Sequence, residues 1–420
     1  MTPLACNRTI SLLPIRSGSD ADHPDVGFGV GDVAGTDALV DGSVAGGDAH
    51  GMSKICAGLG DPIVLPTTST ARVCTSTLAA RGGRFALCSC DDLQVTAPIH
   101  TASVDSNLGA IGPGGVGAVG NGGSSAAIGS DGVLTASAEI LTGGALYVGS
   151  SIAAVDHIAT GRSFRANGAV VLINTDAHVG GDAFVAGSIS GVLRVDGTLH
   201  LPPGVGVDPA SMIPEASIHR EAVSVLPPCD CGIAFVDLGA GIASAVASND
   251  NAIVGLSVDL LAALKTAATV NVTCGTYVLS AIDALQSLTF NVRGRALLVV
   301  TGDVVLRGGL TVSLDPGAEF DLLIGGRLMA SGGDALGSAT PARFRIWVAG
   351  TNSVVLDDAP AVGAMIRAPN AAVTASSGLR LSGGLLARSI ISGGPLDIHF
   401  DEAVLSSGLP CGEPTATSVP

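Results

Sequence analysis

Residues 128–170 read IGSDGVLTASAEILTGGALYVGSSIAAVDHIATGRSFRANGAV. A large apolar residue stands at every sixth position of this stretch: Ile128, Leu134, Ile140, Leu146, Ile152, Ile158, Phe164 and Val170. A step of six fits neither an α-helical face nor a simple alternating strand. It does fit a chain that turns a corner about every six residues and points one large side chain inward from each side. Three such sides make a coil of about eighteen residues, which is the geometry of a β-solenoid.

The same step returns twice further along the chain. It breaks at Asp176 and resumes at Ile189, Val195 and Leu201, and a late set comprises Val373, Leu379, Leu385 and Ile391. Between these sets, short apolar runs separated by glycine-containing turns cover residues 288–324, as in an all-β stack. The sequence therefore predicts an all-β protein of parallel β-helix or β-solenoid type with two β-solenoid sections. The spacing does not determine the handedness of the coils.

Composition shifts suggest the domain boundaries. We expect an irregular, acidic and glycine-rich N-terminal region at 1–83, a first β-solenoid section at 84–204, a linker at 205–228, a second section at 229–411 and a tail at 412–420. The linker ends at Pro227-Pro228, and proline cannot donate to a strand ladder. One short helix is expected within Leu256–Ala267, where Asp259 and Lys265 suit the helix dipole.

The composition narrows the classes of protein. Hydrophobic residues make up 47% of the chain but aromatic residues only 3%, and there are 59 glycines without the period of collagen. A net charge of −16 argues against nucleic acid or anionic lipid as partners, because both require a basic face. We interpret the acidity as a source of solubility, with binding of divalent cations as the alternative. No transmembrane span is expected, because the most apolar region, Ala252–Val272, is interrupted by charges.

Nine cysteines point to an oxidising compartment. The disulfide candidates are Cys56, Cys74, Cys88, Cys90, Cys229, Cys231, Cys274 and Cys411. The two Cys-x-Cys elements are tighter than the C-x-x-C of zinc or redox sites. Connectivity is left open, with a small Cys56–Cys74 loop as one option. No apolar signal segment is visible at the N-terminus. We therefore expect an extracellular or cell-surface location if the start is truncated or mis-assigned, and a cytoplasmic one if it is genuine.

Two polar clusters are candidate sites. Asp156, His157, Asp176, His178 and Asp182 are the metal candidates, since Asp156 and Asp176 are spaced to lie on adjacent coils. The alternative is an ordinary row of stacked surface residues. In the second cluster, Asp397, His399 and Asp401 alternate with apolar residues, as expected of a strand with one wet face. We assign no catalytic residue and expect no cofactor.

Several arginines allow two interpretations of their role. These are Arg293, Arg295, Arg307, Arg343 and Arg345. They could pair with the many carboxylates of the chain, or they could bind an acidic polysaccharide.

Two stretches resemble known families. Ile128–Leu201, with its units GGALYVG (143–149) and GGDAFVAG (180–187), resembles the bactofilin-type polymer-forming β-solenoids. Residues 295–401 are similar to uncharacterised exported surface proteins of myxobacteria and related bacteria, which also carry Cys-x-Cys elements and a closing strand, here Ile398-His399-Phe400-Asp401. This resemblance implies an exported β-solenoid and supplies no catalytic residues.

These observations favour a non-enzymatic structural or adhesive module of the bacterial cell surface or extracellular space. Its partners would be other copies of itself or a surface polysaccharide. A carbohydrate-active β-helix enzyme, a polysaccharide lyase or hydrolase, is the alternative, although such enzymes usually present aromatic platforms to sugars. A left-handed hexapeptide-repeat acyltransferase is a third option, and the cysteine pairs argue against a cytosolic enzyme of that kind.

Overall fold

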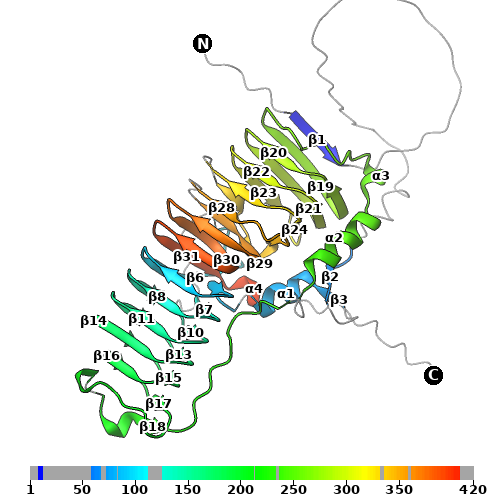
Figure 1. Ribbon diagram of the computed structural model, residues 1–420. Helices are drawn as coiled ribbons and strands as arrows, with labels where there is room; N and C mark the ends of the chain where they lie inside the picture. The colour runs from blue at the N-terminus through cyan, green and yellow to red at the C-terminus, as the bar shows by residue number, and fades with distance from the viewer. Residues whose placement is uncertain are drawn as a thin grey trace, which may run out of the picture.

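The computed structural model describes residues 8–12, 58–67, 72–82, 84–111, 125–211, 213–232, 236–331, 335–357 and 361–406. These residues form an elongated rod of stacked coils (Figure 1). Twenty-nine strands join into one sheet whose pairings are parallel, and strands β2 (Val64–Pro66) and β3 (Arg72–Cys74) form a separate antiparallel hairpin. The predicted fold class, an all-β parallel β-solenoid, is confirmed.

The first section consists of short strands that repeat on three sides. They are β4 (Leu87–Ser89), β5 (Leu93–Val95), β6 (Ile99–Val104), β7 (Ile128–Ser130), β8 (Leu134–Ala136), β9 (Ile140–Thr142), β10 (Leu146–Val148), β11 (Ile152–Ala154), β12 (Ile158–Thr160), β13 (Phe164–Ala166), β14 (Val170–Val179), β15 (Ala183–Val185), β16 (Ile189–Val195) and β17 (Leu199–Leu201). Leu146 is in register with Ile128 and Phe164, which lie 18 residues before and after it. The step of six thus corresponds to one side of a three-sided coil.

Each side of a coil buries two residues rather than one. In strand β11, Ile152 and Ala154 are fully buried, while Ala153 between them is only half-buried. The first inward position carries the large residue of the six-residue step, and the second carries a smaller one such as Ala154 or Thr160. Because successive coils place these positions in register, large side chains stack on large ones along the rod.

Glycine at the corners permits this close stacking. A Cβ atom at Gly149 would lie 2.5 Å from the backbone oxygen of Asp131 on the preceding coil, and one at Gly161 would lie 2.5 Å from that of Gly143. Neither contact is sterically allowed, so the turns of adjacent coils can approach only where a side chain is missing.

The predicted interruption at Asp176 is a longer corner. Val171 and Asp176 flank a shift in the β14–β16 register, and Asn174 adopts a φ of 57°. After this corner the inward position is taken by Leu193, which is fully buried, whereas Val195 is only partly buried. The expected place of Val195 in the six-residue step was therefore wrong, because the next coil is shorter.

The second section has longer strands and wider coils. Its strands are β19 (Ala268–Leu279), β20 (Ile282–Ala284), β21 (Leu288–Val300), β22 (Val304–Leu306), β23 (Leu310–Leu314), β24 (Glu319–Ile324), β25 (Leu328–Ala330), β26 (Leu336–Ser338), β27 (Phe344–Val348), β28 (Val354–Leu356), β29 (Val362–Ala375), β30 (Leu379–Ser392) and β31 (Leu396–Asp401). Phe320 is in register with Phe344, 24 residues later, and their rings stack at 5.7 Å. The wider coils thus accommodate aromatic side chains in the core.

Two local predictions in this section were wrong. The helices lie at α2 (Leu238–Ala247) and α3 (Asn251–Val254), while residues 256–267 form turns that cover the end of the stack. The backbone N–H of Leu264 donates to the carbonyl oxygen of Asp283 in β20. This hydrogen bond therefore joins the segment to the sheet rather than to a helix. In the late six-residue set, Ile391 is 56% exposed, and Ile390, in register with Val373, is the inward residue.

The two sections stack in the reverse of their chain order. The last strands of the second section pair with the first strands of the first section, β30 with β4 and β5, and β31 with β6. This junction, which we call the seam, continues the core, with Leu385 in register with Leu87. From the seam, the first section extends to one end of the rod, and the second extends to the other, where β1 (Arg8–Leu12) pairs with β19 (Figure 1).

Residues 202–211, 213–232 and 236–237 cap the first section and return the chain along the rod. The cap contains the 3₁₀ helices η2 (Pro209–Ser211) and η3 (Glu215–Ser217) and strand β18 (Ile218–Arg220), which pairs with β17. Residues 221–232 run back alongside the coils in the direction of α2 (Figure 1).

Helices and a hairpin cover one side of the second section. The β2–β3 hairpin, α1 (Thr75–Gly82) and α2 pack on outward-facing residues of the coils through a second apolar cluster that includes Leu78, Leu238 and Trp347. Helix α4 (Ala403–Ser406) contacts α1 on the same side (Figure 1). None of the helices in the described ranges has the length and apolar character needed to cross a bilayer.

Candidate functional site

A shallow groove of about 540 Å³ runs along one side of the rod and crosses the seam. It is lined by outward-facing residues on successive coils: Asp397 of β31, His100 of β6, Leu141 of β9, Ala159 of β12 and His178 of β14. Since parallel strands are about 4.8 Å apart, these side chains form an axial row. The two sections therefore contribute to one continuous surface.

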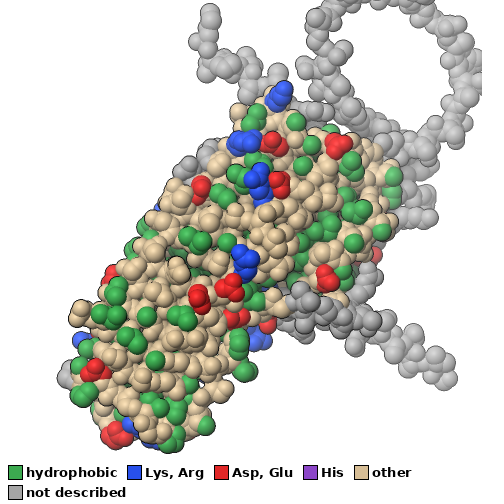
Figure 2. Space-filling model, in the orientation of Figure 1, with side chains coloured by type: hydrophobic (Ala, Val, Ile, Leu, Met, Phe, Trp, Pro, Cys, Tyr) green, Lys and Arg blue, Asp and Glu red, His purple; other side chains and the backbone are tan. Residues whose placement is uncertain are grey.

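Histidines on the rod are paired with carboxylates. Five ring nitrogens lie near a carboxylate oxygen: His100–Glu139 at 3.5 Å, His157–Asp176 at 3.0 Å, His178–Asp196 at 3.1 Å, His200–Glu221 at 2.6 Å and His399–Asp397 at 3.2 Å. Most of these partners are well exposed, so each pair contributes little to stability, at most about 1 kcal/mol. The visible face in Figure 2 likewise shows acidic and basic side chains in small mixed groups rather than in one large patch of a single sign.

The five residues of the first predicted cluster do not converge on one point. His157 and Asp176 do meet, on adjacent coils, and Arg194 approaches the other oxygen of Asp176 at 3.7 Å. His178 instead faces Asp196. Asp156 and Asp182 accept backbone N–H groups, from His157 at 2.7 Å and from Thr198 at 2.8 Å. The metal role of this cluster stays a prediction, and its geometry shows one carboxylate–histidine pair with two turn-capping aspartates.

In the second cluster, Asp397 and His399 lie on the outer face as expected, but Asp401 does not. Asp401 is fully buried, and its carboxylate accepts the backbone N–H groups of Ser106 and Ala342, each at 2.9 Å. Burial raises the pKa of Asp401 above its ordinary value, although these hydrogen bonds oppose the change. The expected wet face was wrong at this residue because the segments around Ser106 and Ala342 cover the end of β31, and the carboxylate ties the last strand to both of them.

The two Cys-x-Cys elements are joined to each other. Cys88 is bonded to Cys229 and Cys90 to Cys231, so the returning chain is fixed to the first strand of the first section. Leu386 of the second section packs against the Cys88–Cys229 bond at the seam. Cys74 and Cys274 are also disulfide-bonded, whereas Cys56 and Cys411 lie outside the described residues.

Asp131 lies beside these disulfides and accepts the backbone N–H of Cys229 at 2.8 Å. Burial raises its pKa, with a smaller contribution from the nearby charges of Asp230 and Asp91. The carboxylate and the sulfur atoms of Cys229 and Cys231 are close enough to suggest a metal site. Both sulfurs are in disulfides, however, and metal coordination requires the thiolate, so Asp131 acts here as a structural acceptor.

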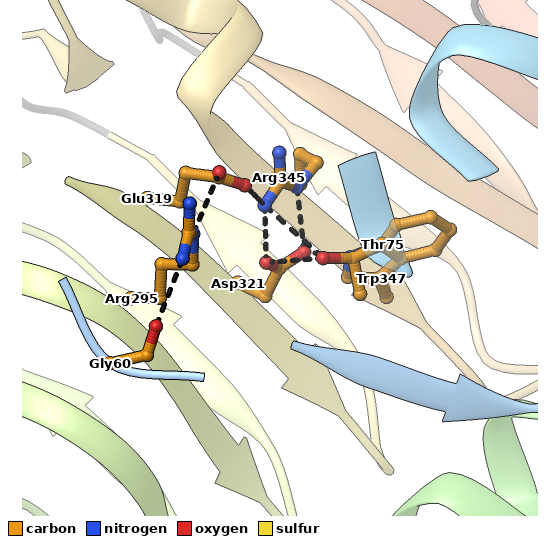
Figure 3. A network of polar contacts seen from close by, with 7 residues as sticks. All are labelled: Gly60, Thr75, Arg295, Glu319, Asp321, Arg345 and Trp347. Atoms are coloured by element: carbon orange, nitrogen blue, oxygen red, sulfur yellow. Dashed lines mark hydrogen bonds and ion pairs between the residues drawn. The ribbon is translucent and has the colours of Figure 1, made fainter. Parts of the chain in front are cut away.

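A buried polar network lies under α1 (Figure 3). Arg345 donates to both oxygens of Asp321, at 2.8 and 2.7 Å, and to Glu319. Trp347 Nε1 donates to Asp321 at 2.7 Å and Thr75 Oγ1 donates at 3.0 Å. Because Thr75 is the first residue of α1, the network fixes this helix to the coils.

Five arginines were expected either to pair with carboxylates or to bind an acidic polysaccharide. Most of them pair with carboxylates. Arg307 lies 2.6 Å from Asp283, Arg295 lies 3.3 Å from Glu319 and Arg293 lies 3.8 Å from Asp315, each on adjacent coils. With the Arg345 pairs, this confirms ion pairing for four of the five. Arg343, the fifth, lies in the 3₁₀ helix η4 (Pro341–Arg343).

Sequence reasoning missed an outward row on a different side of the first section. Its members are the middle residues of successive three-residue strands: Tyr147, Arg165, Phe184, His200 and His219. The Arg165 guanidinium lies 4.3 Å from the centre of the Phe184 ring, and the His200 ring stacks on the other side at 4.2 Å. Part of the signal was available, because Tyr147 and Arg165 directly follow Leu146 and Phe164 of the six-residue step. Phe184, His200 and His219 lie beyond the break in that step, so the pattern did not place them.

Fold and surface together define a β-solenoid repeat protein with paired polar ladders on its outer faces and disulfides at its seam. Residues 238–406 match the model of a family described as a domain of unknown function (DUF7305). This match spans α2 to α4 and therefore covers most of the second section. No curated protein and no solved structure matches the chain.

Proposed function

We propose that this protein is a non-enzymatic structural or adhesive β-solenoid of the bacterial cell surface or extracellular space. The observation that carries the proposal is the seam, where two separate solenoid sections join into one rod and two disulfides hold the returning chain in place. A continuous parallel sheet of this kind provides a long rigid body with repeated outer faces. Such a body suits spacing, display or multivalent contact.

The disulfides support the location. Disulfides form and persist in oxidising environments, and they are rare in the reducing cytosol. The similarity of residues 295–401 to exported surface proteins of myxobacterial type, and of Ile128–Leu201 to bactofilin-type solenoids, agrees with this location. The partners would be further copies of the chain or a surface polysaccharide.

The test uses the protein in its native host. Antibody labelling of intact cells, with permeabilised cells as the control, should detect the protein without permeabilisation. Protein isolated under alkylating conditions should show Cys88, Cys90, Cys229 and Cys231 protected as disulfides. A deletion strain should show a defect in surface integrity or attachment that the wild-type gene restores. A permeabilisation-dependent signal together with reactive thiols at these four positions would overturn the proposal.

A second candidate, a carbohydrate-active enzyme, is favoured by one observation. The groove is lined by the ionisable side chains of His100, His178 and Asp397, and His178 lies 3.1 Å from the carboxylate of Asp196. Such pairs can transfer protons. Turnover of a neutral or uronic-acid polysaccharide by the purified protein, abolished by His178→Ala and kept by the exposed Arg307→Ala, would support this candidate over the first.

A further inference from the structure

Three residues with metal-binding atoms lie close together at the capped end of the rod. His200 lies on β17, the last strand of the first section, His219 lies on the cap strand β18, and Glu221 follows β18 directly. We propose that His200, His219 and Glu221 bind a divalent transition-metal ion, such as Zn²⁺. The site goes beyond the structural role proposed above and does not depend on it.

The register of the two strands brings the imidazoles together. His200 and His219 are paired residues on adjacent parallel strands, and their side chains project from the same face. Their ring centres lie 5.4 Å apart at an angle of 67°. Two imidazoles that bind one metal through nitrogens at about 2.0–2.1 Å have ring centres about 5 Å apart. The ligand atoms of the three residues do not all lie within 4.8 Å of one another, so a change of side-chain rotamer at the exposed His219 would bring them onto one ion.

Glu221 supplies the carboxylate. Its Oε1 atom lies 2.6 Å from Nδ1 of His200, a separation suited either to two neighbouring ligands or to a carboxylate that orients the ring for binding through its other nitrogen. In both arrangements the carboxylate offsets the charge of the cation. Two imidazoles and one carboxylate form a ligand set that zinc and other first-row metals accept.

The site combines a fixed ligand with accessible ones. The His200 side chain is only 15% exposed and stacks on the ring of Phe184 at 4.2 Å, so its position is set by the coil below. His219 and Glu221 are exposed at the surface, so their side chains can adjust and an ion can reach them from solvent. A fourth coordination position would be open to water or to a ligand from a partner.

Metal binding would join the cap to the body of the rod. The three ligands come from the last coil, the cap strand and the start of the returning chain, so one ion would cross-link these segments. A ligand that binds only the folded state stabilises that state. The metal should therefore raise the thermal midpoint of unfolding as well as bind.

The experiment is titration of metal-stripped, tag-free full-length protein with ZnCl₂ by isothermal calorimetry, with NiCl₂ as a second probe. We expect saturable binding that His219→Ala weakens by at least about tenfold and Glu221→Gln weakens by a similar factor. Zinc should raise the midpoint of thermal unfolding of the wild type more than that of His219→Ala.

The matched control is His100→Ala. His100 is also exposed and also faces a carboxylate, that of Glu139, but its neighbours in register are Asp397 and Leu141, so no second imidazole is paired with it. Zinc affinity should be unchanged in this variant. Absence of saturable binding, or equal affinity of the wild type and His219→Ala in correctly folded protein, would overturn the proposal. Circular dichroism of each variant verifies the fold, and both substituted side chains are exposed, so a loss of binding cannot be assigned to unfolding.

Discussion

Arg345 and Asp321 form a two-pronged ion pair across adjacent coils, with Nε 2.8 Å from Oδ1 and Nη2 2.7 Å from Oδ2. Arg345 is 1% exposed and Asp321 is fully buried. Burial alone would lower the pKa of Arg345, but the carboxylates of Asp321 and Glu319 outweigh it and raise that pKa above its ordinary value. Two charges have therefore been removed from water, and each is tolerated because the other is present.

Removing the carboxylate of Asp321 should destabilise the protein strongly. We expect Asp321→Asn to lower the free energy of unfolding by about 3–5 kcal/mol, because it leaves the guanidinium of Arg345 buried with one acidic partner fewer. Urea denaturation followed by circular dichroism measures the change.

The control for this prediction is Asp283→Asn. Asp283 pairs with Arg307 on an adjacent coil at 2.6 Å, but both side chains are more than 40% exposed. Solvent screening limits such a pair to about 0–1 kcal/mol. Equal losses in the two variants would show that burial does not decide the energetics of these ion pairs.

Truncating one large residue of the buried six-residue step should destabilise the protein. Ile152→Ala removes a fully buried side chain that is in register with Leu134 and Val170. We expect a loss of about 2–5 kcal/mol in the free energy of unfolding, because the stacked coils cannot collapse fully into the cavity. Val155→Ala, three residues later at a corner where Val155 is 51% exposed, should change stability by no more than about 0.5 kcal/mol. A small effect of Ile152→Ala would contradict the conclusion that the stacked inward side chains stabilise the coils.

The two disulfides should behave as redundant cross-links. Each joins residues 141 positions apart, so each closes nearly the same loop. Closing a loop of this length is worth about 5 kcal/mol in the chain-entropy model, and that amount is gained once. We expect removal of either pair alone, such as Cys90→Ala with Cys231→Ala, to cost little, and removal of both pairs to cost most of the total. Urea denaturation of the three variants provides the measurement.

Additive losses from the two single-pair variants would contradict this interpretation. They would show that each bond acts through its own local packing rather than through the shared loop. The Cys88–Cys229 bond is the more informative one, since Leu386 packs against it at the seam.

The sequence was sufficient to predict the three-sided coil but not the order in which the two sections stack along the rod. The six-residue step identified the fold because it reports local side-chain burial, which register then repeats. The seam was not predictable, because Leu87 and Leu385 pair across about 300 residues of sequence. Neither segment carries a sequence pattern that identifies the strand with which it pairs. Among the candidate residues, His157 and Asp176 met because their spacing matches one coil.

The places where sequence reasoning failed have physical reasons. Asp401 is polar by type, yet two loop N–H groups satisfy its buried carboxylate. His219 lies in a segment that was expected to be a linker, and only its pairing with β17 brings it to His200. Both cases depend on contacts that arise after the coils have stacked.

Asp401 and Glu319 should give opposite pH dependences of stability. Burial raises the pKa of Asp401, so its contribution is fully present below the unfolded carboxyl pKa of about 3.9 and is lost as the pH rises through the higher folded value. For Glu319, burial is outweighed by Arg345 and Arg295 and the pKa is lowered, so its contribution is present above the unfolded pKa and is lost as the pH falls. The cost of Asp401→Asn relative to wild type should therefore shrink as the pH rises from about 4 to 7, whereas the cost of Glu319→Gln should shrink as the pH falls from about 5 to 3. Urea denaturation from about pH 3 to pH 7 measures both differences, and slopes of the same sign would contradict the assigned causes.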